Sequence, residues 1–220
     1  GMRSVWLAMP LLMCSPCSGA FWAGKRVLLT GASSGLGEAL ARELSARGAT
    51  LAIAARRQER LQAVAESCAN PQLVHVLPLD LAGETATELG DKVNQAAQLL
   101  GGPIQVLICN AGLGQRTSAV ETSAEAHRRI MATNFEGSVA LIREALPPML
   151  EMGDGCAVVA VSSVQGFFGQ PQRSSYAASK AALVGYCDAL RAEVASKLVG
   201  VTLVAPGYIA TDHAASSIGG

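Results

Sequence analysis

The sequence has few aromatic residues, no excess charge of either sign and no hydrophobic run long enough to cross a membrane. Aromatic side chains make up 4% of its 220 residues, and 17 basic residues balance 17 acidic ones. A neutral balance gives no attraction to a polyanion, so we expect no nucleic-acid partner. No stretch reaches the roughly 18 apolar residues that a membrane-spanning helix requires, so we expect no transmembrane helix.

The sequence also lacks a cysteine framework and a metal-ligand pattern. Its six cysteines are scattered, and most lie in apolar or helical patterns where a reduced thiol acts as a small hydrophobe. Cys14 and Cys17 form a C-x-x-C pair of the kind found in redox and zinc sites. No second pair and no histidine at ligand spacing accompany it. We therefore predict no disulfide framework and no metal ion.

The first 23 residues differ from the rest of the chain. Arg3 precedes an apolar run broken by Pro10, and small residues follow from Cys14 to Ala20. This pattern resembles a weak signal peptide or the remnant of a membrane anchor, and a disordered leader or an artefact of the chain's start is the alternative. We treat residues 1–23 as a leader and expect residues 24–220 to form one domain, since 50% hydrophobic residues suffice for one core.

From Lys25 onward, short apolar or β-branched runs alternate with longer helical patterns. This alternation predicts βαβ units and a doubly wound parallel sheet flanked by helices. Nearly continuous apolar runs such as 157–161 are typical of strands buried on both faces. We expect strands at 26–30, 50–54, 73–78, 106–109, 157–161 and 201–204, and helices at 35–47, 58–69, 85–99, 133–152 and 175–197.

Ligands of such a sheet bind beyond the carboxyl ends of its strands, so the residues that follow each strand are the candidates for a site. Those residues are Gly31, Arg56, Asp80, Asn110, Ser163 and Pro206. Most of them are polar residues or glycine, which favours a binding site at this edge.

The first strand runs into a glycine-rich turn that opens a helix. Glycines allow a tight turn and a close approach of the backbone to a phosphate, and the helix N-terminus supplies free N–H groups. A plain helix-entry turn is the alternative, which the flanking strand and helix disfavour. The predicted phosphate-binding residues are Gly31, Ser33, Ser34, Gly35, Leu36 and Gly37.

The end of the second strand indicates which dinucleotide is bound. A dinucleotide fold places an acid there to hold the ribose of NAD, or a cation to hold the 2′-phosphate of NADP. The sequence has Arg56 and Arg57 and no acid. Two guanidinium groups match a phosphate dianion, so we predict NADP(H), with a solvated helix start as the alternative.

Tyr176 and Lys180 lie one helical turn apart at the start of a predicted helix. A phenol is a poor acid or base at neutral pH, but a nearby ammonium lowers its pKa and makes it usable. Ser163, at the end of the fifth strand, could polarise a substrate oxygen with its hydroxyl. Tyr-x-x-x-Lys alone is common by chance, so the site depends on this context.

The glycine turn, Asn110-Ala111-Gly112, and Ser163 with the Tyr176 and Lys180 pair resemble the simple oxidoreductase branch of the short-chain dehydrogenase/reductase family, which has a Rossmann-type fold. The resemblance covers about residues 25–211. It implies that Lys180 binds the nicotinamide ribose and that Asn134 holds a proton-relay water. It assigns further cofactor contacts to Asp80, Leu81, Asn110, Ala111, Gly112, Tyr176, Lys180, Pro206, Gly207, Ile209 and Thr211. Cys109 departs from the family's usual Asn.

The implied activity is hydride transfer between NADP(H) and a carbonyl or alcohol. A non-catalytic NADP(H)-binding module and an inactive fragment are the alternatives. Residues 162–166 and 173–180 resemble the dehydrogenase/reductase member 7 type, kin to the 11-beta-hydroxysteroid dehydrogenases, which implies a lipid, steroid or retinoid-like substrate. Phe167, Phe168 and Tyr208 then become candidates to line an apolar pocket, and a packing role is their alternative.

The resemblance also carries expectations about assembly and location. It implies a homo-oligomer and peripheral membrane association, at the endoplasmic reticulum or otherwise in the cytoplasm. The chain stops at Gly220, whereas members of the family continue with a substrate-covering loop and a seventh strand. We therefore expect a sheet that lacks its last strand, with an open edge at the sixth strand, weak cofactor binding and poor turnover.

Overall fold

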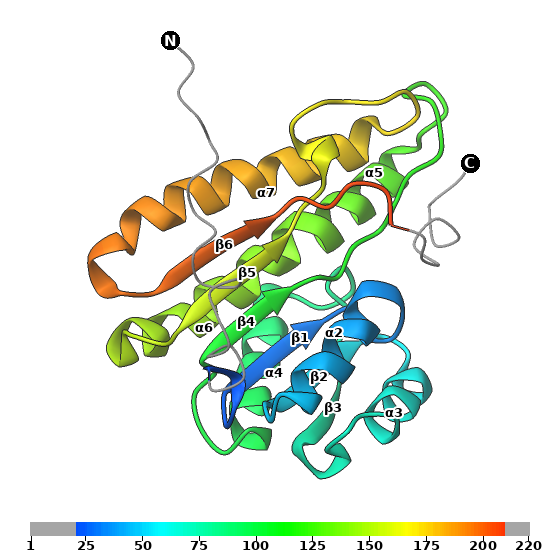
Figure 1. Cartoon of the computed structure of the whole chain (residues 1–220). Coiled ribbons are helices and arrows are strands. Elements are labelled where there is room, and N and C mark those ends of the chain that lie inside the picture. Colours follow the sequence, from blue (N-terminus) through cyan, green and yellow to red (C-terminus); the bar gives the residue numbers. More distant parts are fainter. Residues whose placement is uncertain (1–20, 210–220) are drawn as a thin grey trace.

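A computed structural model of the chain describes residues 21–209, and its centre is a parallel sheet (Figure 1). The strand order β3-β2-β1-β4-β5-β6 is that of a Rossmann-type doubly wound fold, which confirms the predicted fold class. Each strand lies within a residue of its predicted range. The strands are β1 (Arg26–Thr30), β2 (Thr50–Ala55), β3 (Val74–Pro78), β4 (Val106–Cys109), β5 (Ala157–Val161) and β6 (Gly200–Val204).

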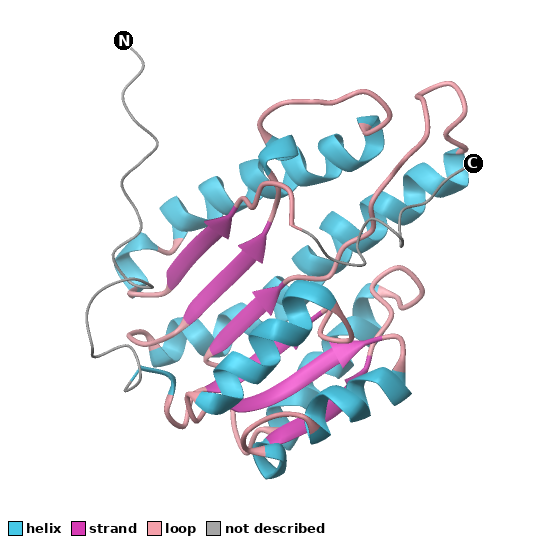
Figure 2. Cartoon of the chain, turned by 45° about the vertical axis from the view of Figure 1, so that its right-hand side comes forward, coloured by secondary structure: helices cyan, strands magenta, loops and turns pink. Residues whose placement is uncertain are grey.

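Helices cover both faces of this sheet (Figure 2). They are α2 (Gly35–Ala46), α3 (Gln58–Glu66), α4 (Ala86–Leu99), α5 (Ala124–Met131), α6 (Gly137–Met152) and α7 (Ser174–Glu193). Sequence analysis missed α5, and its predicted helix 133–152 joined α6 to most of the π-helical turn Ala132–Glu136 that precedes it. The reason is that α5 has only 8 residues, half of them polar, and buries Ile130 alone, so it offers no apolar run long enough to mark a helix.

Two hydrophobic clusters hold the helices to the sheet. On one face, the strands pack against α4, α6 and α7 through residues such as Leu107, Leu141 and Leu183. On the other face, they pack against α2 and α3 through residues such as Leu44 and Leu61. The central strands β1 and β4 are buried on both sides, as their unbroken apolar sequences predict.

The two ends of the described chain differ in their packing. Trp22, near the end of the predicted leader, is 8% exposed and belongs to the cluster under α2. At the other end, β6 pairs with β5 on one side and has no second strand partner within residues 21–209. The C-x-x-C pair and Thr211 lie outside the described residues. The boundary between leader and domain stays a prediction.

The glycine-rich turn brings β1, α2 and the loop after β4 into close contact. Gly31 has a φ of 70°, a conformation that side chains disfavour. A Cβ added at Gly37 would lie 2.2 Å from the Gly31 carbonyl oxygen and 2.6 Å from Asn110 Nδ2. Because backbone occupies that space, α2 can start this close to the sheet only if Gly37 has no side chain.

We expect Gly37→Ala to lower the free energy of unfolding by about 1–3 kcal/mol, because the added methyl overpacks a site bounded by backbone. Gly185→Ala is the matched control, since nothing lies within 4 Å of a Cβ at that helical position. That variant should be more stable by about 0.5–1 kcal/mol. Urea unfolding followed by circular dichroism measures both, and equal stability of Gly37→Ala and wild type would contradict the close packing.

Candidate active site

A cavity of about 690 Å³ opens at the carboxyl edge of the sheet. Its volume lies within the range of small-molecule and cofactor sites. All the predicted catalytic and cofactor-binding residues that the structure describes line it, apart from Asn134. Further residues that the sequence did not indicate also line it, among them Thr30, Arg60, Arg116, Gln165, Gln170 and Arg173.

Cations gather at one end of the cavity, beside the glycine-rich turn. Arg57 Nη2 donates hydrogen bonds to Ser33 Oγ at 3.0 Å and to Ser34 Oγ at 3.3 Å. Arg56 and Arg60 line the same end. Ser34 is the N-cap of α2 and makes no side-chain cap, so the first N–H groups of this helix lack that partner. This end of the cavity therefore suits phosphate groups.

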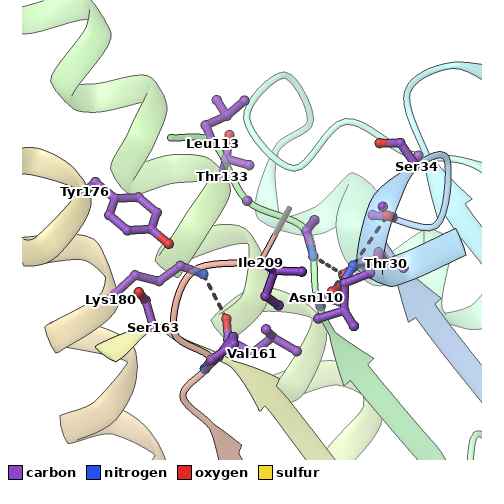
Figure 3. A pocket seen from close by; sticks show the side chains of 18 of the residues that line it. Thr30, Ser34, Asn110, Leu113, Thr133, Val161, Ser163, Tyr176, Lys180 and Ile209 are labelled. Carbon is purple, nitrogen blue, oxygen red and sulfur yellow. Dashed lines mark hydrogen bonds between the residues drawn. The ribbon is translucent and has the colours of Figure 1, made fainter. Parts of the chain in front are cut away.

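Thr30 ties the two central strands together beside the cavity (Figure 3). Its hydroxyl accepts hydrogen bonds from the backbone N–H groups of Asn110 at 3.0 Å and Ala111 at 3.1 Å, and Asn110 Nδ2 donates to the Thr30 carbonyl at 3.0 Å. Sequence analysis passed over Thr30 although it is the last residue of β1. A strand-end hydroxyl was the available signal, but its partners lie 80 residues away.

Cys109, which stands where the resemblance leads one to expect Asn, points away from this edge. Its thiol is 1% exposed, lies 4.0 Å from the Ser138 carbonyl oxygen and does not line the cavity. Burial raises the pKa of this thiol to about 12. Cys109 is therefore a neutral packing residue. Because it does not line the cavity, a cysteine in place of the expected asparagine leaves the cavity lining unchanged.

The other end of the cavity gathers Ser163, which follows β5, with Tyr176 and Lys180 from α7. The hydroxyls of Tyr176 and Ser163 and the Lys180 ammonium point toward one region (Figure 3). Lys180 Nζ lies 6.0 Å from the centre of the Tyr176 ring and donates a hydrogen bond to the Val161 carbonyl at 2.8 Å. The structure thus brings together an acid, a hydroxyl and a cation, as the motif predicts.

The ionisation of this group differs from the expectation. Burial raises the pKa of Tyr176 above its ordinary value, and the hydrogen bond with Ser163 and the charge of Arg173 lower it by less. Burial also lowers the pKa of Lys180 to about 8. The prediction that the ammonium brings the Tyr176 pKa down is therefore wrong for the chain by itself, because desolvation outweighs the nearby charges.

Asn134 lies behind the cavity wall, in the π-helical turn. It is fully buried, its Oδ1 accepts a hydrogen bond from the Leu113 N–H at 2.7 Å, and its Nδ2 donates to the Leu113 carbonyl and to Ser179 Oγ. Asn134 therefore links the loop after β4 to α7. The water-relay role that the resemblance implies stays a prediction.

The segment after β6 closes the cavity beside Ser163. The Val164 N–H donates to the Pro206 carbonyl at 3.1 Å. Pro206, Gly207, Tyr208 and Ile209 all line the cavity. Phe167 and Phe168 do not line it and are more than half exposed, so of the three suggested aromatics Tyr208 alone reaches it.

Residues 21–209 contain neither a metal-ligand cluster nor a helix that could span a membrane. No group of three or more His, Cys, Asp or Glu side chains in this part of the chain is placed to hold a metal ion. No helix in it is both long and apolar enough to span a bilayer.

The buried ammonium of Lys180 should make stability depend on pH. Its pKa is about 8 when folded and 10.5 ordinarily, so between these values the unfolded chain binds more protons and stability rises with pH. Lys180→Met lacks this ammonium and should not gain that stability. We therefore expect its free energy of unfolding, relative to that of wild type, to fall by roughly 2 kcal/mol between pH 7 and pH 9.5. Urea unfolding at both pH values measures this. Lys197→Met, which removes an exposed ammonium, should follow wild type, and parallel curves for Lys180→Met would contradict the assignment.

Comparison with known proteins gives consistent matches. The family model described as "short chain dehydrogenase" matches residues 25–218. The chain is 43% identical over 196 residues to a dehydrogenase/reductase SDR family protein 7-like of Anopheles gambiae, covering 86% of the chain and 60% of that protein. It is 39% identical over 205 residues to dehydrogenase/reductase SDR family member 7B of Danio rerio, covering 89% and 64%. The chain thus spans about three fifths of the length of these relatives.

Solved structures agree with these relatives. A short-chain dehydrogenase from Streptomyces avermitilis superposes with a TM-score of 0.79 at 32% identity, covering 89% of the chain and 69% of that structure. A short-chain dehydrogenase/reductase from Burkholderia phymatum, solved with NAD, gives a TM-score of 0.82 at 25% identity, with coverage of 89% and 69%. With its fold, its cavity and these matches in agreement, the chain belongs to the short-chain dehydrogenase/reductase family and is similar to the family's member 7 and 7B proteins.

Proposed function

We propose that this chain transfers a hydride between NADP(H) and the carbonyl or alcohol carbon of an apolar substrate. The observation that carries the proposal is the convergence of Ser163, Tyr176 and Lys180 at one end of a single cavity. Arginine side chains lie at the other end, with the glycine-rich turn beside them. NADP(H) has a 2′-phosphate at its adenosine end, a pyrophosphate in its middle and the nicotinamide at its other end. Arginines at one end of the cavity, and Ser163, Tyr176 and Lys180 at the other, match this order.

The residues present fit NADP(H). The N–H groups at the start of α2 suit the pyrophosphate, and Arg57, held by Ser33 and Ser34, suits a 2′-phosphate. Close to Lys180, a Cβ at Gly112 would lie 3.5 Å from Nζ, so the cavity wall there is backbone. A ribose could approach this wall and accept hydrogen bonds from the ammonium. The nicotinamide itself supplies or accepts the hydride.

The chain's own residues would polarise the substrate oxygen and transfer the proton to it. Ser163 donates a hydrogen bond to the substrate oxygen and polarises the carbonyl. Tyr176, whose pKa is raised by burial, carries its proton at neutral pH and delivers it to the oxygen that gains charge as the hydride arrives. Lys180 provides a cation behind the phenol. In the reverse direction the same phenol, once ionised, accepts the alcohol proton, so oxidation should speed up as pH rises.

An apolar substrate fits the residues around this end of the cavity. Leu113, Val164, Tyr208 and Ile209 line it, and Tyr208 is 90% exposed. These side chains favour a lipid, steroid or retinoid-like carbonyl over a small polar one. A homo-oligomer and peripheral membrane association stay predictions that accompany this proposal.

Tyr176→Phe tests the proposal. Loss of the hydroxyl removes the proton donor, so NADPH-dependent reduction of a panel of ketones, aldehydes and ketosteroids should fall by about 10²–10⁴-fold. The shift in unfolding temperature on adding NADPH should remain, because the ring stays in place.

Tyr186→Phe is the control on the same helix, since Tyr186 does not line the cavity and should be replaceable without loss of turnover. Unchanged turnover in Tyr176→Phe would refute the mechanism. A wild-type chain that shows the NADPH-dependent shift but reduces nothing in the panel would indicate a non-catalytic binding module.

Arg57→Ala tests the choice of cofactor. A hydrogen bond to a charged group contributes about 1.5–3 kcal/mol, so kcat/KM with NADPH should fall roughly 10-fold to 100-fold while the value with NADH changes little. Steady-state kinetics with both cofactors measures this. Arg42→Ala removes an exposed guanidinium of α2 that does not line the cavity, and should leave both values unchanged. Equal losses with NADH and NADPH would count against a 2′-phosphate contact.

A further inference from the structure

Helix α7, which carries Tyr176 and Lys180, starts without a cap of its own. The first N–H groups of a helix have no partner within the helix and are commonly satisfied by the side chain of the N-cap residue. The N-cap of α7 is Arg173, which makes no side-chain cap. The N–H groups of Ser175 and Tyr176 therefore need an acceptor from elsewhere.

Gln115 supplies that acceptor from the loop after β4. Its Oε1 accepts hydrogen bonds from the Ser175 N–H at 2.8 Å and from the Tyr176 N–H at 3.1 Å. These are the donors that a cap within the helix would satisfy, although Gln115 lies 60 residues from Ser175 in the chain. One of the two bonds is to the backbone of the proposed proton donor itself.

Both polar atoms of the Gln115 side chain, Oε1 and Nε2, make hydrogen bonds. It is 0% exposed, and its Nε2 donates to Thr122 Oγ1 at 2.7 Å and to the Thr117 carbonyl at 3.3 Å. Its backbone carbonyl accepts a hydrogen bond from Arg173 Nη1, so the loop and the start of α7 are joined twice. A buried amide with all its partners is a rigid link, because any movement would leave a buried polar atom unsatisfied.

This link helps to determine the distance between the Tyr176 hydroxyl and Ser163, which α7 cannot determine alone. The helix sets the spacing of Tyr176 and Lys180, but Ser163 comes from β5, and the loop wall at Leu113 follows β4. Where the first turn of α7 lies therefore decides how the phenol meets Ser163 and the cavity. Gln115 does not line the cavity, so it acts on the reaction through the residues that it holds, and Tyr176 is the one among them that is proposed to move the proton.

We infer that Gln115 is a positioning residue, a cap supplied by the loop after β4 that holds the first turn of α7 so that the Tyr176 hydroxyl meets Ser163. The inference rests on the proposed function, since it names what places that function's proton donor. A merely structural residue would change stability alone. A positioning residue changes kcat while cofactor binding is preserved.

The test compares Gln115→Met, Gln115→Asn and Gln115→Glu in the full chain. The first removes the acceptor and the second withdraws it by one methylene. The third keeps an acceptor at Oε1, with a charge that is favourable at a helix N-terminus, but replaces the Nε2 donor by an oxygen that faces the Thr117 carbonyl. We expect kcat for NADPH-dependent reduction to fall about 10-fold to 100-fold in the Met and Asn variants, because a shift of about 1 Å at a reacting group has effects of this size. The KM for NADPH should stay within about two-fold of wild type, and Gln115→Glu should lose less of kcat than Gln115→Met, because it retains the acceptor that caps α7.

Ser175→Ala is the matched control. It removes the hydrogen bond of the Ser175 hydroxyl to His127 Nδ1, which also joins α7 to a neighbouring helix, and leaves both N–H groups on Gln115. Its kcat should remain near the wild-type value. A loss as large as that of Gln115→Met would show that general docking of α7 matters, and would overturn the inference.

Hydrogen–deuterium exchange gives a readout that needs no turnover. The Ser175 and Tyr176 amides should lose protection in Gln115→Met and Gln115→Asn, and keep it in Gln115→Glu and Ser175→Ala. Lost protection with wild-type kcat would overturn the positioning role and leave the proposed function standing. A wild-type chain that binds NADPH and turns over no substrate would refute the proposed function, and with it the catalytic part of the inference, whereas exchange would still report on the cap.

Discussion

The close approach of β1 and β4 is the constraint on which the rest of the site depends. These two strands flank the point where the chain reverses its direction of travel across the sheet, and the crevice of a doubly wound fold opens there. The Thr30 hydroxyl joins the two strand ends, and Gly37 lets α2 start against the Gly31 carbonyl. Without that proximity, the N–H groups of α2 and the wall at Gly112 could not face one cavity.

A second constraint comes from burying a cation at the other end of the cavity. Lys180 is 3% exposed, and the Val161 carbonyl accepts one of its hydrogen bonds. Removing an ammonium from water disfavours its charged form, which is why its pKa falls to about 8. A lysine at this position therefore costs stability at neutral pH, and a functional role for its charge would explain why the fold tolerates it.

Several parts of the chain that lie far apart in the sequence determine where Tyr176 is. Asn134 ties Leu113 to α7 through Ser179, and Gln115 caps the first turn of that helix. Both links start in the loop after β4, which also forms the wall beside the glycine-rich turn. The end of the cavity beside the glycine-rich turn and the end at Tyr176 are thus connected by the one loop between β4 and α5. A change in this loop should therefore reach both ends of the site.

By itself, the sequence determined the strands, their parallel arrangement and the larger part of the cavity lining, because buried strands are unbroken apolar runs and polar or glycine residues follow directly after them. It could not indicate α5, which buries only Ile130. Nor could it indicate the hydrogen bonds that join Thr30 to Asn110 and Gln115 to Ser175, because these pairs are 80 and 60 residues apart. It also gave the wrong direction for the Tyr176 pKa. Motif spacing shows which charges are near, but desolvation depends on how every neighbouring element packs, and only the tertiary structure decides that.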